Sequence, residues 1–402
     1  MTALPIEQPV PAAAMSDRPY IPLRLEVVAR DDLAKFPHWQ RAFAGERKDH
    51  RYYELIEDTL HPEFDYRYFI LRDARGEVRA VEPFFMLDQD LLVGISGRLG
   101  RLIEGVRRVW PRFMRMRTVM VGCVAGEGHL DGAERHGRLL ARQLAALITG
   151  HARALGARLV VLKEFPSRYR PTLECFLDNG FSRIPSMPMT RLSIDYPSFD
   201  DYAKHALSGR TRRDLRKKFR AAEEGAALEM SVVTDVTPFI HEIYPLYLQV
   251  YERSKLHFEK LTEQYFRELG HRMRDKVRFF LWRRNGRIVA FATCMTQDDA
   301  LYAEYIGLDY DVALDLHLYH YIFRDVVTWA IANGYKWFRS SGLNYDPKFH
   351  LRHLLDPLDL YVRHTSATIN TVMKWLLPLL EPTRYDKTLA KFSNYHELWS
   401  IR

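Results

Sequence analysis

The chain has few cysteines, no long apolar run and no apolar leader. Its 402 residues contain only Cys123, Cys175 and Cys294, without CxxC spacing, so neither a zinc site nor a disulfide framework is indicated. No run of about 18 apolar residues occurs, which argues against a membrane-spanning helix. Residues 1–20 lack the basic start and apolar core of a signal peptide. We therefore expect a disordered tail at residues 1–20 and a protein of the reducing cytoplasm.

Acidic residues are scarce in two stretches of this chain, whose formal net charge is +8. Residues 98–117 contain seven arginines and one acid, interleaved with apolar and aromatic residues. Residues 210–220 contain seven lysines and arginines, one acid and a single aromatic residue, Phe219. The first pattern is typical of a basic amphipathic segment, which could contact an anionic membrane or pack as an insertion on a second domain. The second predicts a charged helix.

The clearest local pattern lies between residues 277 and 348. Apolar runs at 277–283, 287–296 and 300–307 are separated by Asn285-Gly286 and by a polar three-residue turn, which predicts an antiparallel meander. A helix with one apolar face follows and ends at Gly334. Residues 336–341 then predict a strand parallel to the run at 300–307, because a helix separates the two.

This order resembles the GNAT acyltransferase superfamily, in its FemAB-like branch with two such domains in tandem. Four passages carry the resemblance: residues 208–224 (SGRTRRDLRKKFRAAEE), 244–266, 303–309 (AEYIGLD) and 334–350 (GYKWFRSSGLNYDPKFH). It implies an α/β (α+β) fold of two tandem GNAT-like domains, each a mixed, mostly antiparallel sheet flanked by helices. The glycine-containing pyrophosphate loop of the superfamily is replaced here by residues 311–317, which contain no glycine.

The first half repeats the same order of strands and helices without visible sequence identity. Residues 191–195 are expected to close its sheet. Because it lacks obvious catalytic side chains at the corresponding strand ends, residues 21–197 are interpreted as a scaffold or acceptor-side domain. Residues 198–402 are interpreted as the acyltransferase domain.

The resemblance implies an acyl-CoA, such as acetyl-CoA, as co-substrate. In the family's geometry, Tyr305, Ile306 and Gly307 would lie along the pantetheine arm. Leu316 and His317 would open the helix beneath the pyrophosphate, where backbone N–H groups can bind an anion. A glycine at 307 would let the cofactor approach the backbone, although it could also be an ordinary strand end.

Glu304 is the single acid in the run at 300–307 and is the candidate general base. An amine acceptor must lose a proton, because the pKa of an alkylammonium group is about 10. A carboxylate in the meander could take that proton directly or through water, whereas a solvent-facing or salt-bridged glutamate is the alternative. Strand alternation places Tyr302 on the same face, as a candidate for substrate binding.

Tyr345, Asp346 and Lys348 follow the strand at 336–341, and sites gather at such strand ends in α/β sheets. Tyr345 is the second catalytic candidate, as proton donor to the departing thiolate. Asp346 and Lys348 are candidates for substrate binding, and all three residues could instead belong to an ordinary loop. The histidines lack the spacing and glutamate of helical zinc sites, so no metal is expected.

Together these features predict a bacterial N-acyltransferase that moves an acyl group from acyl-CoA to a small-molecule or peptide amine held between the two domains. One alternative is transfer from aminoacyl-tRNA to a peptidoglycan precursor or small molecule, in which residues 210–220 could contact phosphates. Those residues could also face the phosphates of CoA or form a solvated helix face. The other alternative is a degenerate GNAT-fold binding module. The sequence does not specify the oligomeric state.

Overall fold

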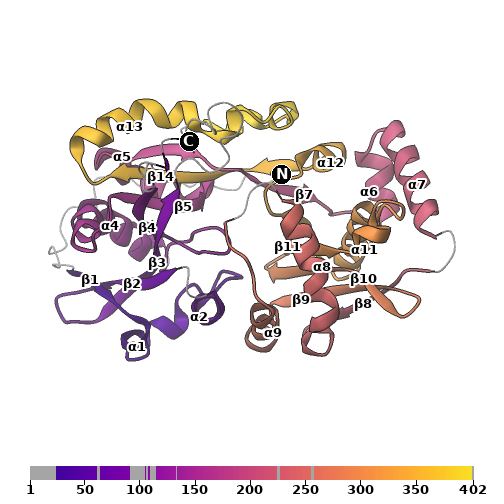
Figure 1. Cartoon of the computed structure of the whole chain (residues 1–402), viewed down its shortest axis with the longest axis horizontal. Coiled ribbons are helices and arrows are strands. Elements are labelled where there is room, and N and C mark those ends of the chain that lie inside the picture. The colour runs from indigo at the N-terminus through magenta and orange to yellow at the C-terminus, as the bar shows by residue number, and fades with distance from the viewer. Residues whose placement is uncertain are drawn as a thin grey trace, which may run out of the picture.

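Two seven-stranded sheets lie side by side in the computed structural model (Figure 1). The structure describes residues 24–60, 64–90, 115–132, 134–223, 227–254 and 258–400, together with Gly105, Arg107 and Arg108. The tail expected at residues 1–20 and most of the basic stretch 98–117 lie outside these residues.

The first sheet has the order β1-β2-β3-β4-β5-β14-β6, and only its β4–β5 pair is parallel. Helices α4 (Glu134–Ala154) and α5 (Arg170–Asp178) cover one face through an apolar core. The strands are β1 (Arg24–Val28), β2 (Asp65–Arg72), β3 (Val78–Asp90), β4 (Arg115–Val121), β5 (Leu159–Pro166), β6 (Ser182–Pro185) and β14 (Leu358–His364).

The second sheet has the order β13-β7-β12-β11-β10-β9-β8, with β11–β12 as its parallel pair. Its β9-β10-β11 meander is the predicted one, and the turn residues Asn285 and Gly286 have φ values of 52° and 79°, as a type I′ hairpin requires. The strands are β7 (Met189–Ser193), β8 (Glu229–Val233), β9 (Val277–Arg284), β10 (Arg287–Gln297), β11 (Ala300–Leu308), β12 (Trp337–Ser340) and β13 (Leu354–Asp356).

Helices flank both faces of the second sheet. An apolar core joins one face to α6 (Phe199–Ala206), α7 (Gly209–Glu223) and α11 (Leu318–Ala332), while α8 (Ile240–Arg253) and α9 (Glu263–Arg272) cover the other. The predicted class, mixed and mostly antiparallel sheets flanked by helices, is therefore confirmed.

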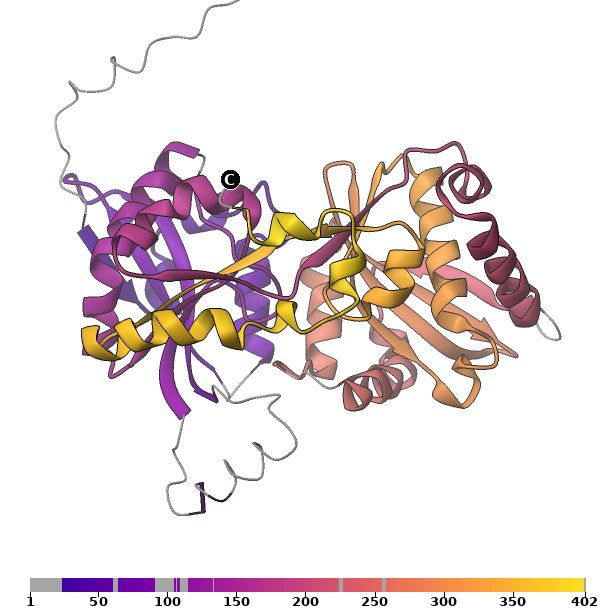
Figure 2. The same cartoon turned by 90° about the horizontal axis from the view of Figure 1, so that it is seen from above.

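Each sheet contains a strand from the opposite half of the chain. The chain crosses from β6 to β7 through residues 186–188 and returns from β13 to β14 through Pro357, as the extended segments between the two sheets in Figure 2 show. The sequence predicts that residues 191–195 close the first sheet, and this is wrong, because β7 pairs with β12 and β13 of the second sheet. An expected boundary at residue 197 thus falls after the first crossing. Alternation within a strand does not show which sheet the strand joins, because strand pairing is non-local.

One apolar core spans both halves. It includes Phe43 and Ile56, near and within α2 (His50–Thr59), and Ile240 and Phe291 from the second half. Burial of these side chains fixes the two sheets against each other. No helix within the described part of the chain is long and apolar enough to cross a membrane.

Candidate active site

The two parallel strands of the second sheet part after four residue pairs. β11 and β12 are in register from Ala300 and Trp337 to Ala303 and Ser340, where β12 ends. β11 continues to Leu308, and residues 304–308 have no ladder partner on that side within the described residues. Their other side stays paired with β10. An open edge of a parallel pair is the geometry that could hold an extended ligand.

A β-bulge and a constrained turn accompany this parting. Consecutive residues Thr293 and Cys294 of β10 pair with Tyr305 and Ala303, so Glu304 is the extra residue of a bulge, which increases local twist. Beyond β12, Leu343 and Asn344 have φ values of 71° and 48°, in the left-handed region.

Lys348 holds that turn from α12 (Tyr345–His350). Its buried ammonium donates to the carbonyl oxygens of Ser341, at 2.6 Å, and Leu343, at 3.0 Å. Burial lowers the pKa of Lys348 to about 7. The sequence predicts a substrate-binding Lys348, and in the structure its ammonium binds these two carbonyl oxygens.

Glu304 joins a buried cluster of four charged side chains from both halves. Its Oε1 lies 2.7 Å from Arg47 Nε and its Oε2 lies 3.0 Å from Lys48 Nζ, while Arg47 also pairs with Glu127. None of the four side chains is more than 9% exposed. Burial opposes ionisation, yet Arg47 and Lys48 hold the pKa of the Glu127 carboxyl well below its usual range. The salt-bridged alternative considered for Glu304 is therefore the arrangement present.

Arg47 and Lys48 belong to a charged segment, residues 46–51, that joins the two halves. Asp49 Oδ2 lies 2.7 Å from Lys276 Nζ, and Arg51 pairs with Asp275 at 2.9 Å. Arg47 also places its guanidinium 3.8 Å from the centre of the Tyr302 ring, so Tyr302 packs against this cluster. The sequence reading missed this segment, because a run of residues of both charges is typical of a solvated surface.

Glycine lets the first half reach this cluster. Glu127 lies between Gly126 and Gly128, and a Cβ added at Gly126, where φ is 131°, would lie 2.0 Å from Lys48 Nζ. A Cβ at Gly128 would lie 2.6 Å from the ring of Phe165. Four glycines between residues 122 and 132, directly after a buried strand, were the signal that could have indicated this close approach.

Tyr305, the next residue along the open edge, contacts a second acid. Its hydroxyl donates to Glu259 Oε1 at 3.0 Å, and its ring meets the edges of Tyr247 and Tyr265. Burial raises the pKa of Glu259, with Lys163 acting in the opposite direction. Glu259 was not a candidate from the sequence, because it stands in a polar stretch without a local motif.

Gly307 is required by packing. A Cβ there would lie 2.2 Å from the Phe291 ring and 2.8 Å from the backbone nitrogen of Tyr247, because α8 lies directly against β11. This reason differs from the two considered from the sequence. Ile306, between Gly307 and Tyr305, packs against the core on the opposite face of the sheet.

The start of α11 differs in detail from the prediction. The N–H groups of Leu316 and His317 donate to Val312 O at 3.0 Å and Leu314 O at 3.2 Å, so α11 begins only at Leu318. Its first turn lies beside α7, where Lys218 Nζ is 3.2 Å from His320 Nε2. Burial and the Lys218 charge lower the pKa of His320 to about 4.

Two predicted residues lie in another environment. The Tyr345 hydroxyl donates to Pro188 O at 2.8 Å, and its ring packs in a small core with Phe392, where burial raises its pKa. Asp346 is exposed near Lys391. The structure thus groups Tyr302, Glu304 and Tyr305 around β11. It places Tyr345 and Asp346 elsewhere, beside residues near the C-terminus.

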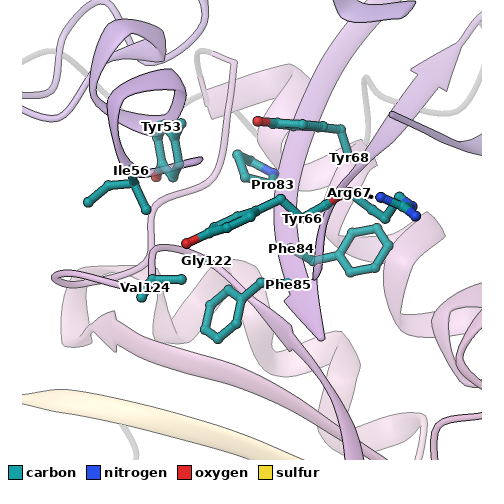
Figure 3. Close-up of a pocket in the computed structure, with 10 residues that line it drawn as sticks. All are labelled: Tyr53, Ile56, Tyr66, Arg67, Tyr68, Pro83, Phe84, Phe85, Gly122 and Val124. Carbon is teal, nitrogen blue, oxygen red and sulfur yellow. Dashed lines mark hydrogen bonds between the residues drawn. The ribbon is translucent and has the colours of Figure 1, made fainter. Parts of the chain in front are cut away.

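A separate aromatic hollow lies in the first half, between α2 and the first sheet (Figure 3). None of the candidate residues from the sequence lines it. Within the described residues, the buried Tyr53 hydroxyl beside it has no hydrogen-bond partner, and no group of three or more acids, histidines or cysteines could hold a metal. The lining residues are Tyr53, Ile56, Tyr66, Arg67, Tyr68, Pro83, Phe84, Phe85, Gly122 and Val124.

Several solved structures are similar to the chain in outline. L-PGS from Bacillus licheniformis shares 15% identity over 85% of this chain and 98% of that one, with a TM-score of 0.49. FemX shares 11% identity over 77% of this chain and 90% of that one, with a TM-score of 0.48. A tandem GNAT protein from the clavulanic acid biosynthesis pathway shares 12% identity over 86% of this chain and 99% of that one, with a TM-score of 0.46. These values are too low to carry a substrate from those proteins to this one.

The comparison of sequences gives the more direct result. No curated protein matches the chain. Residues 172–344 match the model of the FemAB-like family, which is described as acting in peptidoglycan biosynthesis or recognition. This match confirms the predicted FemAB-like resemblance over residues 172–344 and relates them, at family level, to peptidoglycan biosynthesis or recognition.

Proposed function

We propose that this protein is an N-acyltransferase that moves an acyl group from an acyl-CoA to an amine acceptor bound where the two halves meet. The observation that carries the proposal is the open edge of β11 beyond Ala303. Backbone groups at Tyr305 to Gly307 could bind the pantetheine arm as an added strand would be bound. The first turn of α11, from Leu318, offers N–H groups to the phosphates, and Lys218 stands beside it.

The reaction needs a base for the acceptor. The amine nitrogen attacks the thioester carbonyl, the carbon–sulfur bond breaks, and the thiolate leaves, while backbone N–H groups stabilise the intermediate oxyanion. Glu304 is the base predicted from the sequence. Its two oxygens are bound by Arg47 and Lys48, however, so neither oxygen is free to face an acceptor amine.

Glu259 is the better base in this arrangement. Burial raises its pKa, which makes its carboxylate a stronger proton acceptor than an exposed glutamate. The bond from Tyr305 holds its carboxylate on the face of β11 that α8 and α9 cover. We therefore assign the proton to Glu259 and the positioning of that carboxylate to Tyr305, and we assign Glu304 to anchoring the two halves. Tyr345 stays the predicted acid, and it would have to leave Pro188 O to protonate the thiolate.

Binding and turnover test these assignments separately. Acetyl-CoA at 100 times its Kd should stabilise the protein by about 2.7 kcal/mol. Release of CoA thiol is then followed with primary amines, amino acids and peptidoglycan stem peptides. Glu259→Gln should keep the stabilisation and lose at least about 100-fold in kcat, within the usual effect of a general base. Tyr305→Phe is the matched control and should lose less.

Two results would refute the proposal. A flat thermal response to all acyl-CoAs would favour a binding module without catalysis. Full turnover by Glu259→Gln, with loss in Glu304→Gln at unchanged folding, would return the base to Glu304.

The exposed basic face of α7 favours one second candidate, transfer from aminoacyl-tRNA. Five exposed cations share this helix next to the start of α11: Arg210, Arg213, Arg216, Lys217 and Arg220. Lysine and arginine contacts to phosphates are independent of sequence and weaken with salt. Copurification with tRNA, together with activity abolished by ribonuclease, would select this candidate over acyl-CoA.

A further inference from the structure

Lys163 is a buried lysine of the first half that reaches the second half. It follows Leu162, the last residue of β5 that pairs with β4. Its Nζ donates to Gly126 O at 3.0 Å and to Glu164 Oε2 at 2.6 Å, and only 8% of the residue is exposed. The same ammonium lies 5.0 Å from the centre of the Phe258 ring, within the range of a cation–π contact. Phe258 directly precedes the proposed base, so Lys163 meets the segment that supplies this base.

The backbone fixes the place from which Lys163 extends. Glu164, the next residue, has a φ of 56°, a left-handed conformation that is costly for a residue other than glycine. Its carbonyl oxygen accepts from Gly128 N at 3.1 Å, and its Oε1 accepts from Ser186 Oγ at 3.2 Å. These bonds hold the chain at this point of β5 and leave the Lys163 side chain little freedom.

The segment that contains Glu259 is held by both halves. The Phe258 ring stacks on Phe64 of the first half with ring centres 6.0 Å apart, and it meets the edge of Phe85 at 6.2 Å. Tyr305 of the second half donates to the Glu259 carboxylate at 3.0 Å. The position of this carboxylate therefore depends on contacts from both halves.

Charged and titratable side chains from four elements act on Glu259. They are Lys163 and Glu164 from β5, Tyr247 from α8, Tyr265 from α9 and Tyr305 from β11. Burial raises the pKa of each of the three tyrosines, so they are neutral near pH 7. After burial, the Lys163 charge has the largest effect on the pKa of Glu259 and lowers it, whereas Glu164 raises it.

We propose that Lys163 is a positioning residue for Glu259, through which the first half holds the base and favours its ionised form, an inference that rests on the function proposed above. A cation close to a carboxylate stabilises the ionised form, and this is the form that accepts a proton. The sequence predicts that the first half is a scaffold or acceptor side without catalytic side chains. In this proposal the first half takes part in the reaction site through Lys163.

The pH dependence of kcat/KM in the full chain tests this proposal, because its acidic limb reports the base of the free enzyme. Lys163→Met removes the charge and keeps an apolar side chain, so it should shift the acidic limb to higher pH. Lys163→Arg should keep the limb near that of the parent. Lys260→Met is the matched control, because Lys260 follows Glu259 directly but is exposed and lies 5.6 Å from the centre of the Tyr251 ring. Its limb should stay unchanged.

Urea unfolding across pH gives a second readout that needs no turnover. Because folding raises the pKa of Glu259, this residue contributes stability at low pH that is lost as the pH rises through the folded pKa. The difference in the free energy of unfolding between the parent and Glu259→Gln should therefore change with pH. Adding Lys163→Met to both proteins should move this change to higher pH.

The outcomes separate this inference from the proposed function. Absence of acyl transfer by the parent with any acyl-CoA would refute the proposed function and the inference with it. An active parent whose acidic limb is unchanged in Lys163→Met, or is shifted equally in Lys260→Met, would refute the inference alone. Lys163→Gln, which can still donate to Gly126 O, takes the place of Lys163→Met if the latter does not fold, and the same shift is expected.

Discussion

Replacing Glu304 by glutamine should destabilise the protein strongly. Arg47, Lys48, Glu127 and Glu304 form a cluster with a formal charge of zero, and none of these side chains is more than 9% exposed. Glu304→Gln leaves one uncompensated positive charge in this buried site. Removing one partner of a buried ion pair costs about 3–5 kcal/mol. The glutamine oxygen can still accept one hydrogen bond, so we expect the lower end, about 3 kcal/mol.

Urea unfolding measures this loss from the midpoint and the slope. Glu252→Gln, at an exposed position of α8, should change stability by less than about 0.5 kcal/mol. Adding Lys48→Met to Glu304→Gln restores neutrality and should recover part of the loss, which a double-mutant cycle reports as coupling. A Glu304→Gln protein as stable as the Glu252→Gln control would refute the view that Glu304 anchors the two halves.

Three further substitutions test packing and ionisation. Gly307→Ala should lower the free energy of unfolding by about 1–3 kcal/mol, because its Cβ would lie 2.2 Å from the Phe291 ring. Gly150→Ala is the control and should not destabilise the protein, because a Cβ there has no neighbour within 4 Å. Equal urea midpoints for the two variants would contradict this. The pKa of Lys348 is about 10.5 in the unfolded chain and about 7 in the folded protein. The unfolded state therefore binds more protons between these pH values, and the free energy of unfolding should rise with pH there by at most about 1.4 kcal/mol per unit. Lys348→Met should flatten this rise. The pKa of Glu127 in the folded protein lies well below its unfolded value near 4.5, so Glu127 contributes to the free energy of unfolding above that pH, and this contribution is lost as the pH falls below it. Glu127→Gln should be less stable than the parent at pH 7. On acidification it should lose less stability than the parent does.

Local chemistry explains what the sequence revealed. The hairpin at Asn285-Gly286 and the helix end at Gly334, where φ is 81°, depend on a few adjacent residues, so their patterns predict them. The order of meander, helix and parallel strand follows from the same local signals. These elements placed β11 next to β12 and directed attention to residues 303–307.

Non-local contacts explain what the sequence did not reveal. The exchange of β7 and β14 between the sheets depends on pairings with strands about 150 to 200 residues away, such as Leu192 with Phe338. Burial of Arg47 and Lys48 depends on carboxylates supplied by Glu127 and Glu304 from distant strands and loops. No property of residues 46–51 alone distinguishes such a buried segment from a solvated one.

Backbone hydrogen exchange with and without acetyl-CoA tests the account most directly. If the pantetheine arm lies along the open edge, exchange should slow at residues 304–308 and in the first turn of α11, at Leu318 and Tyr319. Exchange in the aromatic hollow around Tyr53 should stay unchanged. Unchanged exchange at residues 304–308 under saturating acetyl-CoA, or protection confined to the hollow, would contradict the proposed binding site.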